Sequence, residues 1–450
     1  MNYFSLNNNC LSLFAPRHRA NLSKDMTRGL IITLLMSTAL PAWAVEIDDS
    51  TTTPVQTSTA NNGSADDVEV TEDGEIDLTE QPGTTAITVD SNNSVTNEGE
   101  IVAEDTDNVT AIAVQADVTA DITHIGSIDL YEDYDREDED DDDDDDGPLA
   151  VGSNRIGINV ASGGTVTGDI LLDYGSILYI EGNDSAGVIV GSSLAGDYTQ
   201  QGTISVFGDN ARGLAFEDDV DGDVLISGTI TAQGQNASAL EFEGDVSGNV
   251  TIESTISSTG FTSTSATNYV APIYVDDDTE AVEDRLDEDD LYDNATAVRI
   301  TGSLGHGLLI NGAVDDFTSE EDEDDETKDT IDDFDENRTA GRIYSYGSAP
   351  ALSIQADSDE ALVLSGVVET VRDTTDDDDD DDLDEILVTF SYDQGLINRG
   401  TIYATGQNIG FDATALSIDG SNDETGTVSI EGGILNTGSI QATAYEASST

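Results

Sequence analysis

The residues that could do chemistry in this chain are few, and their spacing matches no catalytic motif. His124 and His306 are the only histidines after residue 44, and no G-x-S-x-G, H-E-x-x-H or G-x-x-x-x-G-K motif occurs. Nucleophilic, zinc-protease and nucleotide chemistry therefore lack their parts. We predict that the chain is not an enzyme and has no catalytic or cofactor-binding residues. His306 is expected at an exposed corner.

Carboxylates are the most abundant candidate ligands for a metal ion. The closest approach to a calcium loop is Asp142, Asp144, Asp146 and Gly147, but Ser153 stands where the closing bidentate glutamate is needed. The run from Asp376 to Asp382 is a polyelectrolyte without fixed ligand spacing. We predict no specific metal site and no cofactor, only weak, non-specific association of Ca²⁺ with the acidic runs; the alternative is a physiologically relevant weak calcium site.

The net charge excludes whole classes of partner. The 450 residues include 95 Asp and Glu against 14 Lys and Arg, which gives a formal charge of −81. A surface this negative repels nucleic acid and anionic lipid headgroups. We therefore expect neither nucleic-acid binding nor direct lipid binding, and an anionic polysaccharide would meet strong repulsion.

Residues 27 to 44 have the order of a secretory signal peptide. Arg28 precedes an apolar run from Leu30 to Leu40, and the box Ala42-Trp43-Ala44 follows. This order predicts cleavage after Ala44, and the apolar run is too short to cross a bilayer. An N-terminal membrane anchor is the alternative.

The signal peptide, residues 1–44, has a long n-region from Met1 to Arg28. It is an extended signal, or translation starts at Met26. Cys10, the only cysteine, lies before the cleavage point, so the mature chain is expected to contain no thiol.

An internal repeat of 26 residues is the strongest structural signal. GTISVFGDNARGLAFEDDVDGDVLIS begins at Gly202, GTITAQGQNASALEFEGDVSGNVTIE follows at Gly228, and a more degenerate copy begins at Ser176. The spacing matches these apolar pairs: Ile204 with Ile230, Leu214 with Leu240, Phe216 with Phe242, Val220 with Val246, Val224 with Val250, and Ile226 with Ile252.

Within each unit, apolar residues alternate with polar ones in short bursts bounded by Gly, Asn or Asp. Such alternation predicts strands with one face inward, and these bounding residues favour turns. One coil of about three strands cannot bury its inner face alone, so the coils must stack. We predict an all-β fold, a parallel β-solenoid (right-handed β-helix) of 26-residue coils over residues 70–450. Residues 45–69, rich in Ser, Thr, Asn and Asp, are predicted to be a disordered or weakly ordered lead-in.

Acidic insertions interrupt the repeat near residues 131–147, 261–293, 315–338 and 371–385. The chain leaves after Gly260 and returns at Asn294 in register, and the run after Ile128 leaves from an equivalent position. We expect the insertions to be solvated loops that leave the solenoid at a single corner.

The signal peptide followed by degenerate coils of the form N-A-x-A-φ-x-φ-x-G-x-V-x-G-x-φ-x-φ-x-x-G-T-I (φ, apolar) resembles the passenger region of autotransporters, the type V secretion proteins. The resemblance covers roughly residues 27 to 450. It implies a passenger displayed on the surface of a Gram-negative bacterium, associated with the outer membrane through a translocator barrel, and often an adhesin. The C-terminal barrel of the family is missing here, so we expect the translocator in a longer form of the protein.

These observations predict an exported surface protein that acts by adhesion or interaction, or as a spacer, with a glycan or matrix protein as its unknown ligand. Two alternatives remain open. One is a glycan-cleaving β-helix, which needs clustered carboxylates and stacked aromatic residues on one groove. The other is a purely structural, polyanionic surface fibre.

Overall fold

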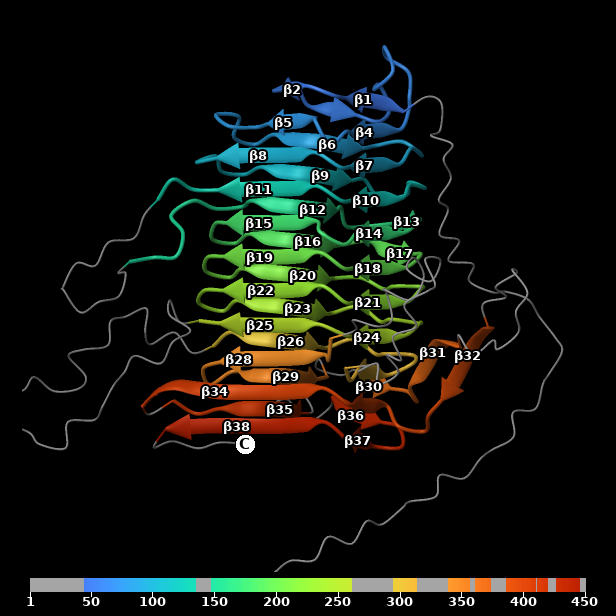
Figure 1. Ribbon diagram of the computed structural model, residues 1–450, viewed down its shortest axis with the longest axis vertical. Coiled ribbons are helices and arrows are strands. Elements are labelled where there is room, and N and C mark those ends of the chain that lie inside the picture. The colour runs from blue at the N-terminus through green and yellow to red at the C-terminus, as the bar shows by residue number, and fades with distance from the viewer. Residues whose placement is uncertain are drawn as a thin grey trace, which may run out of the picture. The chain divides into compact units, whose positions relative to one another are not determined.

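Each 26-residue repeat folds as one coil of a parallel β-solenoid (Figure 1). The computed structural model describes residues 44–134, 147–260, 294–313, 339–356, 361–373, 386–409, 411–419 and 426–445. The chain divides into two units, Met1–Ala42 and Trp43–Thr450, and all described residues belong to the second. No helix occurs among them, and hence none that could cross a membrane.

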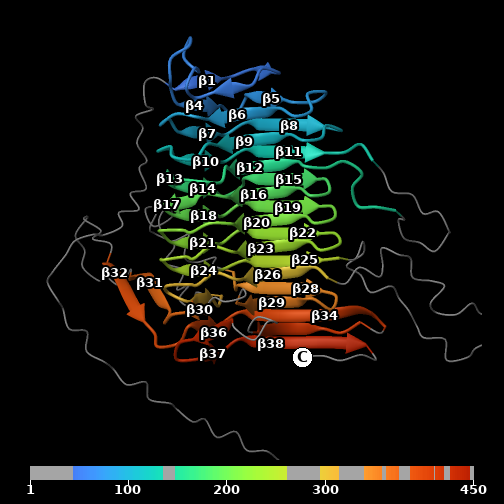
Figure 2. The same cartoon turned by 180° about the vertical axis from the view of Figure 1, so that it is seen from behind.

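Three long parallel sheets, here named A, B and C, run along the stack. In every complete coil the chain passes through one strand of A, one of B and one of C (Figures 1 and 2). Sheet A contains β1 (Val45–Ile47), β4 (Val68–Val70), β7 (Val95–Asn97), β10 (Ile122–His124), β14 (Ile170–Leu172), β18 (Tyr198–Gln200), β21 (Val224–Ile226), β24 (Val250–Ile252), β27 (Leu308–Ile310), β33 (Leu396–Asn398) and β37 (Ile434–Asn436).

Sheet B contains β2 (Ser50–Thr51), β5 (Glu75–Asp77), β8 (Glu100–Glu104), β11 (Ser127–Tyr131), β15 (Ile177–Glu181), β19 (Thr203–Phe207), β22 (Thr229–Gln233), β25 (Thr255–Thr259), β28 (Arg342–Tyr346), β34 (Thr401–Ile409) and β38 (Ser439–Tyr445). Sheet C contains β3 (Val55–Gln56), β6 (Thr85–Val89), β9 (Thr110–Val114), β12 (Ile156–Val160), β16 (Ala186–Val190), β20 (Arg212–Phe216), β23 (Ser238–Phe242), β26 (Thr296–Ile300), β29 (Pro350–Gln355) and β35 (Thr414–Asp419).

Shorter pairs complete the coils. A narrow fourth ladder lies between sheets C and A, where β13 (Thr165–Thr167) pairs with β17 (Ser193–Ala195) and β30 (Ala361–Leu364) with β36 (Thr427–Ile430). Single bridges join these pairs through Val220, Val246 and Leu304. One antiparallel hairpin, β31 (Val368–Asp373) with β32 (Ile386–Ser391), lies at the side of the stack.

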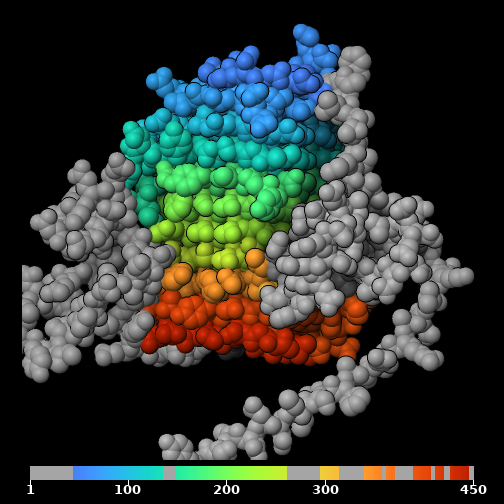
Figure 3. All heavy atoms as spheres, viewed as in Figure 1, coloured from blue at the N-terminus to red at the C-terminus, as the bar shows by residue number. Residues whose placement is uncertain are grey.

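The core is a set of columns in which each inward residue lies on its repeat equivalent. The predicted pairs are confirmed in register, with Ile204 opposite Ile230, Leu214 opposite Leu240 and Val224 opposite Val250. Phe216 and Phe242 stack with their ring planes 8° apart and their centroids 5.1 Å apart. In the space-filling view, the coils form successive layers in the order of the chain (Figure 3). Successive coils thus bury one continuous apolar core.

Asparagine and glycine turn the corner between sheets B and C. Gly234 has φ +141°, and a Cβ there would collide with the carbonyl oxygen of Gly208 in the coil above. Asn210 and Asn236 both have left-handed φ, 57° and 59°, and the amide of Asn236 donates to Asn210 Oδ1 at 3.2 Å. The corner therefore requires residues that tolerate positive φ, as the sequence predicted.

The predicted lead-in at residues 45–69 is wrong, because these residues form the first coil. β1 pairs with β4, β2 with β5 and β3 with β6. Polar composition hid this coil, since a threonine fills one of its core positions. Thr57 is fully buried, and its hydroxyl accepts a hydrogen bond from the Asp90 amide at 3.1 Å.

Two of the four acidic insertions leave the stack at the predicted corner. Residues 135–146 and 261–293 both join a sheet B strand to a sheet C strand. The expectation of a single corner is wrong for the others. Residues 314–338 join β27 of sheet A to β28 of sheet B, and residues 374–385 join the two strands of the hairpin. Any corner can hold an insertion, because only the register of the flanking strands must be kept.

Candidate functional site

His124 is a core residue. It is fully buried at the end of β10, where the Asn97 amide lies 3.1 Å from Nδ1 and the Ile177 carbonyl 3.2 Å from Nε2. Because the Asn97 amide donates, Nδ1 accepts that hydrogen bond. Nε2 therefore carries the proton and donates a hydrogen bond to the Ile177 carbonyl. Burial lowers the pKa of His124 to about 4, and the ring is neutral at pH 7.

His306 lies in the turn before β27, five strands farther along sheet A, and it is half-buried rather than exposed. Its position, opposite Gly248 in the preceding coil, follows from the pairing of Val246 with Leu304 and of Val250 with Leu308. The structure does not bring the two histidines together.

Of the residues that most resemble a calcium loop, the structure describes only some. Asp142, Asp144, Asp146 and the run Asp376–Asp382 lie outside the described residues. Ser153 belongs to the corner, where its amide donates to Asp107 Oδ1 at 2.8 Å and its backbone pairs with Asn183. In the described part of the chain, no group of three or more His, Cys, Asp or Glu side chains is placed to hold a metal ion.

Corner carboxylates accept hydrogen bonds from the next coil. Asp169 Oδ1 accepts from the Asp197 amide, and Asp197 Oδ1 from the Asp223 amide, both at 2.8 Å. Burial raises the pKa of Asp197, and the nearby Asp223 and Asp169 carboxylates raise it further. Aspartates in these rows therefore cap the turns of the stack.

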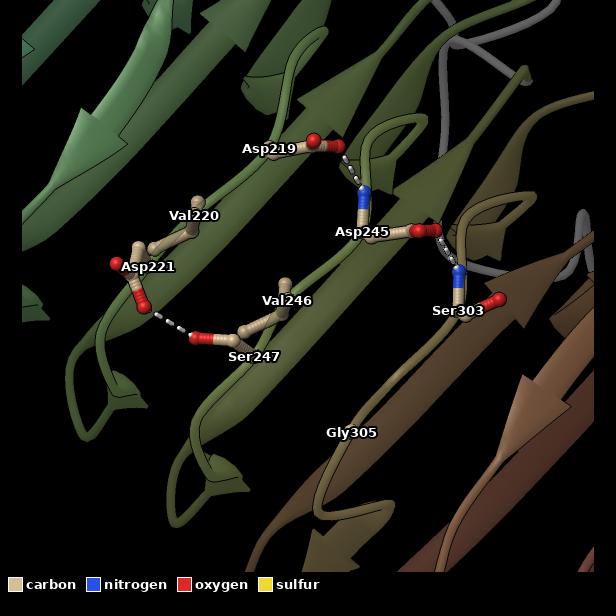
Figure 4. Close-up of a pocket in the computed structure, with 8 residues that line it drawn as sticks. All are labelled: Asp219, Val220, Asp221, Asp245, Val246, Ser247, Ser303 and Gly305. Carbon is tan, nitrogen blue, oxygen red and sulfur yellow. Dashed lines mark hydrogen bonds between the residues drawn. The ribbon is translucent and has the colours of Figure 1, made fainter. Parts of the chain in front are cut away.

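A shallow hollow lies along the fourth ladder and is lined by Asp219, Val220, Asp221, Asp245, Val246, Ser247, Ser303 and Gly305 (Figure 4). Asp219 accepts from the Asp245 amide at 2.9 Å, and Asp245 accepts from the Ser303 amide at 2.6 Å. Both carboxylates are thus engaged in joining coils.

Five charged side chains form a network on the outer face of sheet C. Arg212 contacts Glu217 at 2.6 Å and Glu241 at 2.9 Å, and Arg299 contacts Glu243 at 2.8 Å. The carboxylates on adjacent strands would repel each other, and the two arginines between them remove that repulsion. This is the clustered-carboxylate arrangement that a glycan-cleaving site needs, but every carboxylate in it is paired with a guanidinium.

A buried arginine closes the base of the first acidic insertion. Arg155 is 2 % exposed, and its Nη1 lies 2.7 Å from Glu132 Oε1. Glu132 also accepts from the amides of Val151 and Gly152, on the returning side of the insertion. The two ends of residues 135–146 are therefore held together by one buried ion pair.

Arg399 plays the equivalent part at the hairpin. It forms a two-pronged pair with Glu369 of β31, at 2.7 and 2.8 Å, and its Nη2 lies 2.9 Å from the Tyr392 hydroxyl after β32. It also reaches Asn311 Oδ1 at 3.3 Å, close to where residues 314–338 leave the stack. One guanidinium thereby joins the bases of two acidic segments.

The outer face of sheet B differs from the rest of the surface. Its central column of outward residues reads Tyr179, Ser205, Thr231, Ser257, Tyr344 and Tyr403 through successive strands. Tyr344 and Tyr403 meet edge to face with centroids 5.9 Å apart, and the hydroxyls of Thr231 and Ser257 are 3.2 Å apart.

Reasoning from the sequence missed the arginine clamps and this face. The available signals were weak: a lone arginine beside an acidic run at Arg155, and strand segments without a carboxylate in an acidic chain. Comparison of the chain with family models, with curated proteins and with solved structures gives no match.

Proposed function

We propose that this chain is an exported, autotransporter-like passenger that acts at the cell surface by binding a ligand. The observation that carries the proposal is the start of the solenoid at Val45, directly after the Ala42-Trp43-Ala44 box. Cleavage at that box would release a chain that enters its first coil at once. The expected location is the surface of a Gram-negative bacterium, with an outer-membrane translocator in a longer form.

Binding is favoured over catalysis by the state of the carboxylates. Those in the sheet C network are paired with Arg212 and Arg299, and those in the corner rows accept backbone amides. A glycosidase needs one carboxylic acid and one free carboxylate beside the same bond. Groups that already serve as caps and ion pairs are poorly suited to either role.

A polyanionic spacer is a second candidate, favoured by two arginine clamps, the buried Arg155 and the half-buried Arg399. Arg155 and Arg399 fix where acidic segments leave and rejoin the stack. Burying an arginine is costly, and such a cost is best explained if the position of the segment matters. In this role hydration and charge repulsion would themselves be the function.

Export is tested by expressing the full chain in a Gram-negative host and sequencing the N-terminus of the periplasmic product. We expect it to begin at Val45. Ala42→Asp with Ala44→Asp should block processing, because the box needs small residues at its first and third positions. Trp43→Asp, at the permissive middle position, is the matched control. An unprocessed chain in the cytoplasm would contradict the proposal.

The two candidate roles separate on ligand binding. The purified chain is applied to arrays of glycans and matrix proteins with and without Ca²⁺, and circular dichroism verifies β structure in each buffer. Saturable binding to one class of ligand supports the binding role. Absence of binding with the β signal intact supports the spacer role.

A further inference from the structure

Charge is unevenly distributed along sheet B. The six strands β19, β22, β25, β28, β34 and β38 contain no Asp or Glu, although the chain has 95 of them. The four strands before them, β5, β8, β11 and β15, each contain a carboxylate. Burial raises the pKa of Glu100 in β8, and the Asp129 and Glu75 carboxylates raise it further. The acidic character of the sheet thus stops where the carboxylate-free strands begin.

The carboxylate-free strands expose hydroxyl groups in regular rows. We name as the hydroxyl face the outward serines and threonines of β19, β22 and β25 together with the tyrosines that flank them: Thr203, Ser205, Thr229, Thr231, Thr255, Ser257, Tyr179, Tyr344 and Tyr403. The nine side chains are exposed or half-buried. Successive rows are about 4.8 Å apart, so Tyr179 and Tyr344 lie roughly 19 Å apart along the stack.

Aromatic rings stand at both ends of these rows. Tyr179 contacts Phe207 with a centroid separation of 5.4 Å, and Tyr344 contacts Tyr403 at 5.9 Å. Each pair supports its rings from the side, which limits their rotation. A partly exposed tyrosine ring offers an apolar surface, and its hydroxyl adds a polar tip.

This combination matches the chemistry of a neutral sugar polymer. A pyranose ring has a C–H face that packs on aromatic rings and a rim of hydroxyls that both donate and accept hydrogen bonds. Serine and threonine hydroxyls also do both. The field of the surrounding carboxylates, including Glu181, which accepts from the Tyr179 hydroxyl, repels an anionic chain. The central strands β19, β22 and β25 carry no carboxylate that would attract a cationic chain.

We infer that the hydroxyl face binds a neutral polysaccharide that lies along the stacking axis. Sugar rings pack on Tyr179 at one end and on Tyr344 and Tyr403 at the other, and the serine and threonine rows bond the sugars between them. The inference rests on the proposed binding function and names its ligand class. A protein partner fits less well, because protein interfaces depend on anchors buried in pockets and this face is a flat sheet.

The test measures co-sedimentation of the full chain with insoluble neutral polysaccharides, namely amorphous cellulose, chitin and β-1,3-glucan. Soluble polygalacturonate, followed by gel retardation, is the anionic comparison. We expect saturable binding to at least one neutral polymer and none to polygalacturonate. Tyr344→Ala with Tyr403→Ala should weaken binding about tenfold or more, as expected when anchoring aromatic residues are removed.

A charge placed on the face gives the matched pair of variants. Thr231→Glu puts a carboxylate in the middle of the rows and should also weaken binding about tenfold. Thr251→Glu makes the same change at a half-buried outward threonine of β24 in sheet A, and it should leave binding unchanged. Circular dichroism of both variants verifies that the solenoid is intact.

The outcomes separate this inference from the proposed function. Binding that survives both Thr231→Glu and the double tyrosine change would overturn the inference, as would equal loss in Thr251→Glu. A chain that is processed and exported but binds only proteins or anionic polymers would overturn it and leave the proposed function standing. Neutral-polymer binding by a chain that is not exported would support the hydroxyl face and reject the proposed location.

Discussion

His124 is an ionisable side chain in a core made mainly of aliphatic residues. Its pKa in the folded chain is about 4, below the usual value of 6.5, because burial opposes the charged ring. The unfolded chain therefore takes up this proton first as the pH falls. The stabilising contribution is complete above pH 6.5 and is lost between 6.5 and about 4, by about 3 kcal/mol in total.

We therefore expect His124→Gln to lose less stability than the parent between pH 7 and pH 5. Glutamine can still accept from Asn97 but does not titrate. Urea denaturation of both proteins at the two pH values measures the difference. Carboxylates with a raised pKa, such as Asp129, act in the opposite direction but are common to both proteins and cancel. Equal pH dependence of the two proteins would contradict the assignment.

Phe216 is the centre of an aromatic stack, with Tyr198 edge-on at 5.1 Å and Phe242 parallel at 5.1 Å. It is fully buried between adjacent coils. If its ring is removed, the close-packed neighbours cannot move far enough to fill the cavity that is left. Phe216→Ala should lower the free energy of unfolding by about 3–5 kcal/mol. Phe207→Ala, at a half-buried outward position of the same coil, should cost clearly less; chemical denaturation compares the two.

The loops at the solenoid corners depend on side chains from several coils. Arg155, after β11 and before β12, joins Glu132 and Asp107 and donates to the Thr106 carbonyl. Removing one partner of a buried pair leaves the other charge uncompensated. Arg155→Met should therefore destabilise the chain by about 3–5 kcal/mol, and adding Glu132→Gln should restore part of that loss.

Hydrogen exchange locates this effect. The amides of Val151 and Gly152 donate to Glu132, so they should exchange faster in Arg155→Met than in the parent. Amides of β22 and β25, several coils away, serve as the internal reference. Uniform acceleration across all coils would show that Arg155 supports the whole stack rather than the base of one insertion.

The whole molecule is quasi-one-dimensional, since each coil contacts mainly its neighbours. Deleting residues 203–228 removes one full repeat and would place β15 against β22, with Leu178 opposite Ile230 in the same inward column. We expect this deletion to keep the β signal and a cooperative unfolding transition. Deleting residues 203–215, half a repeat, should abolish both, because the inward columns no longer align.

Circular dichroism with thermal unfolding distinguishes the two deletions. Loss of structure in both would mean that the coils are not interchangeable. Retention of structure in both would mean that the 26-residue register does not hold the stack together. Either result would contradict the repeat reading of the fold.

The sequence by itself determined the coil length, the inward residues and their register. This was possible because a parallel stack places each repeat on its own equivalent. A local spacing therefore becomes a long-range contact, as between Ile204 and Ile230. Alternating polarity and the Gly and Asn corners then define the three strands of a coil.

Only the tertiary structure decided what the polar residues do. Arg155 acquires its role from Glu132, across the insertion in its own coil, and from Asp107 in the preceding coil, and no period in the sequence marks them. Thr57 in the first coil is likewise a polar residue, and only the folded structure shows that it is buried in the core. The hydroxyl face could not be predicted, because outward positions vary freely within a repeat, and their chemistry emerges only when several coils present them side by side.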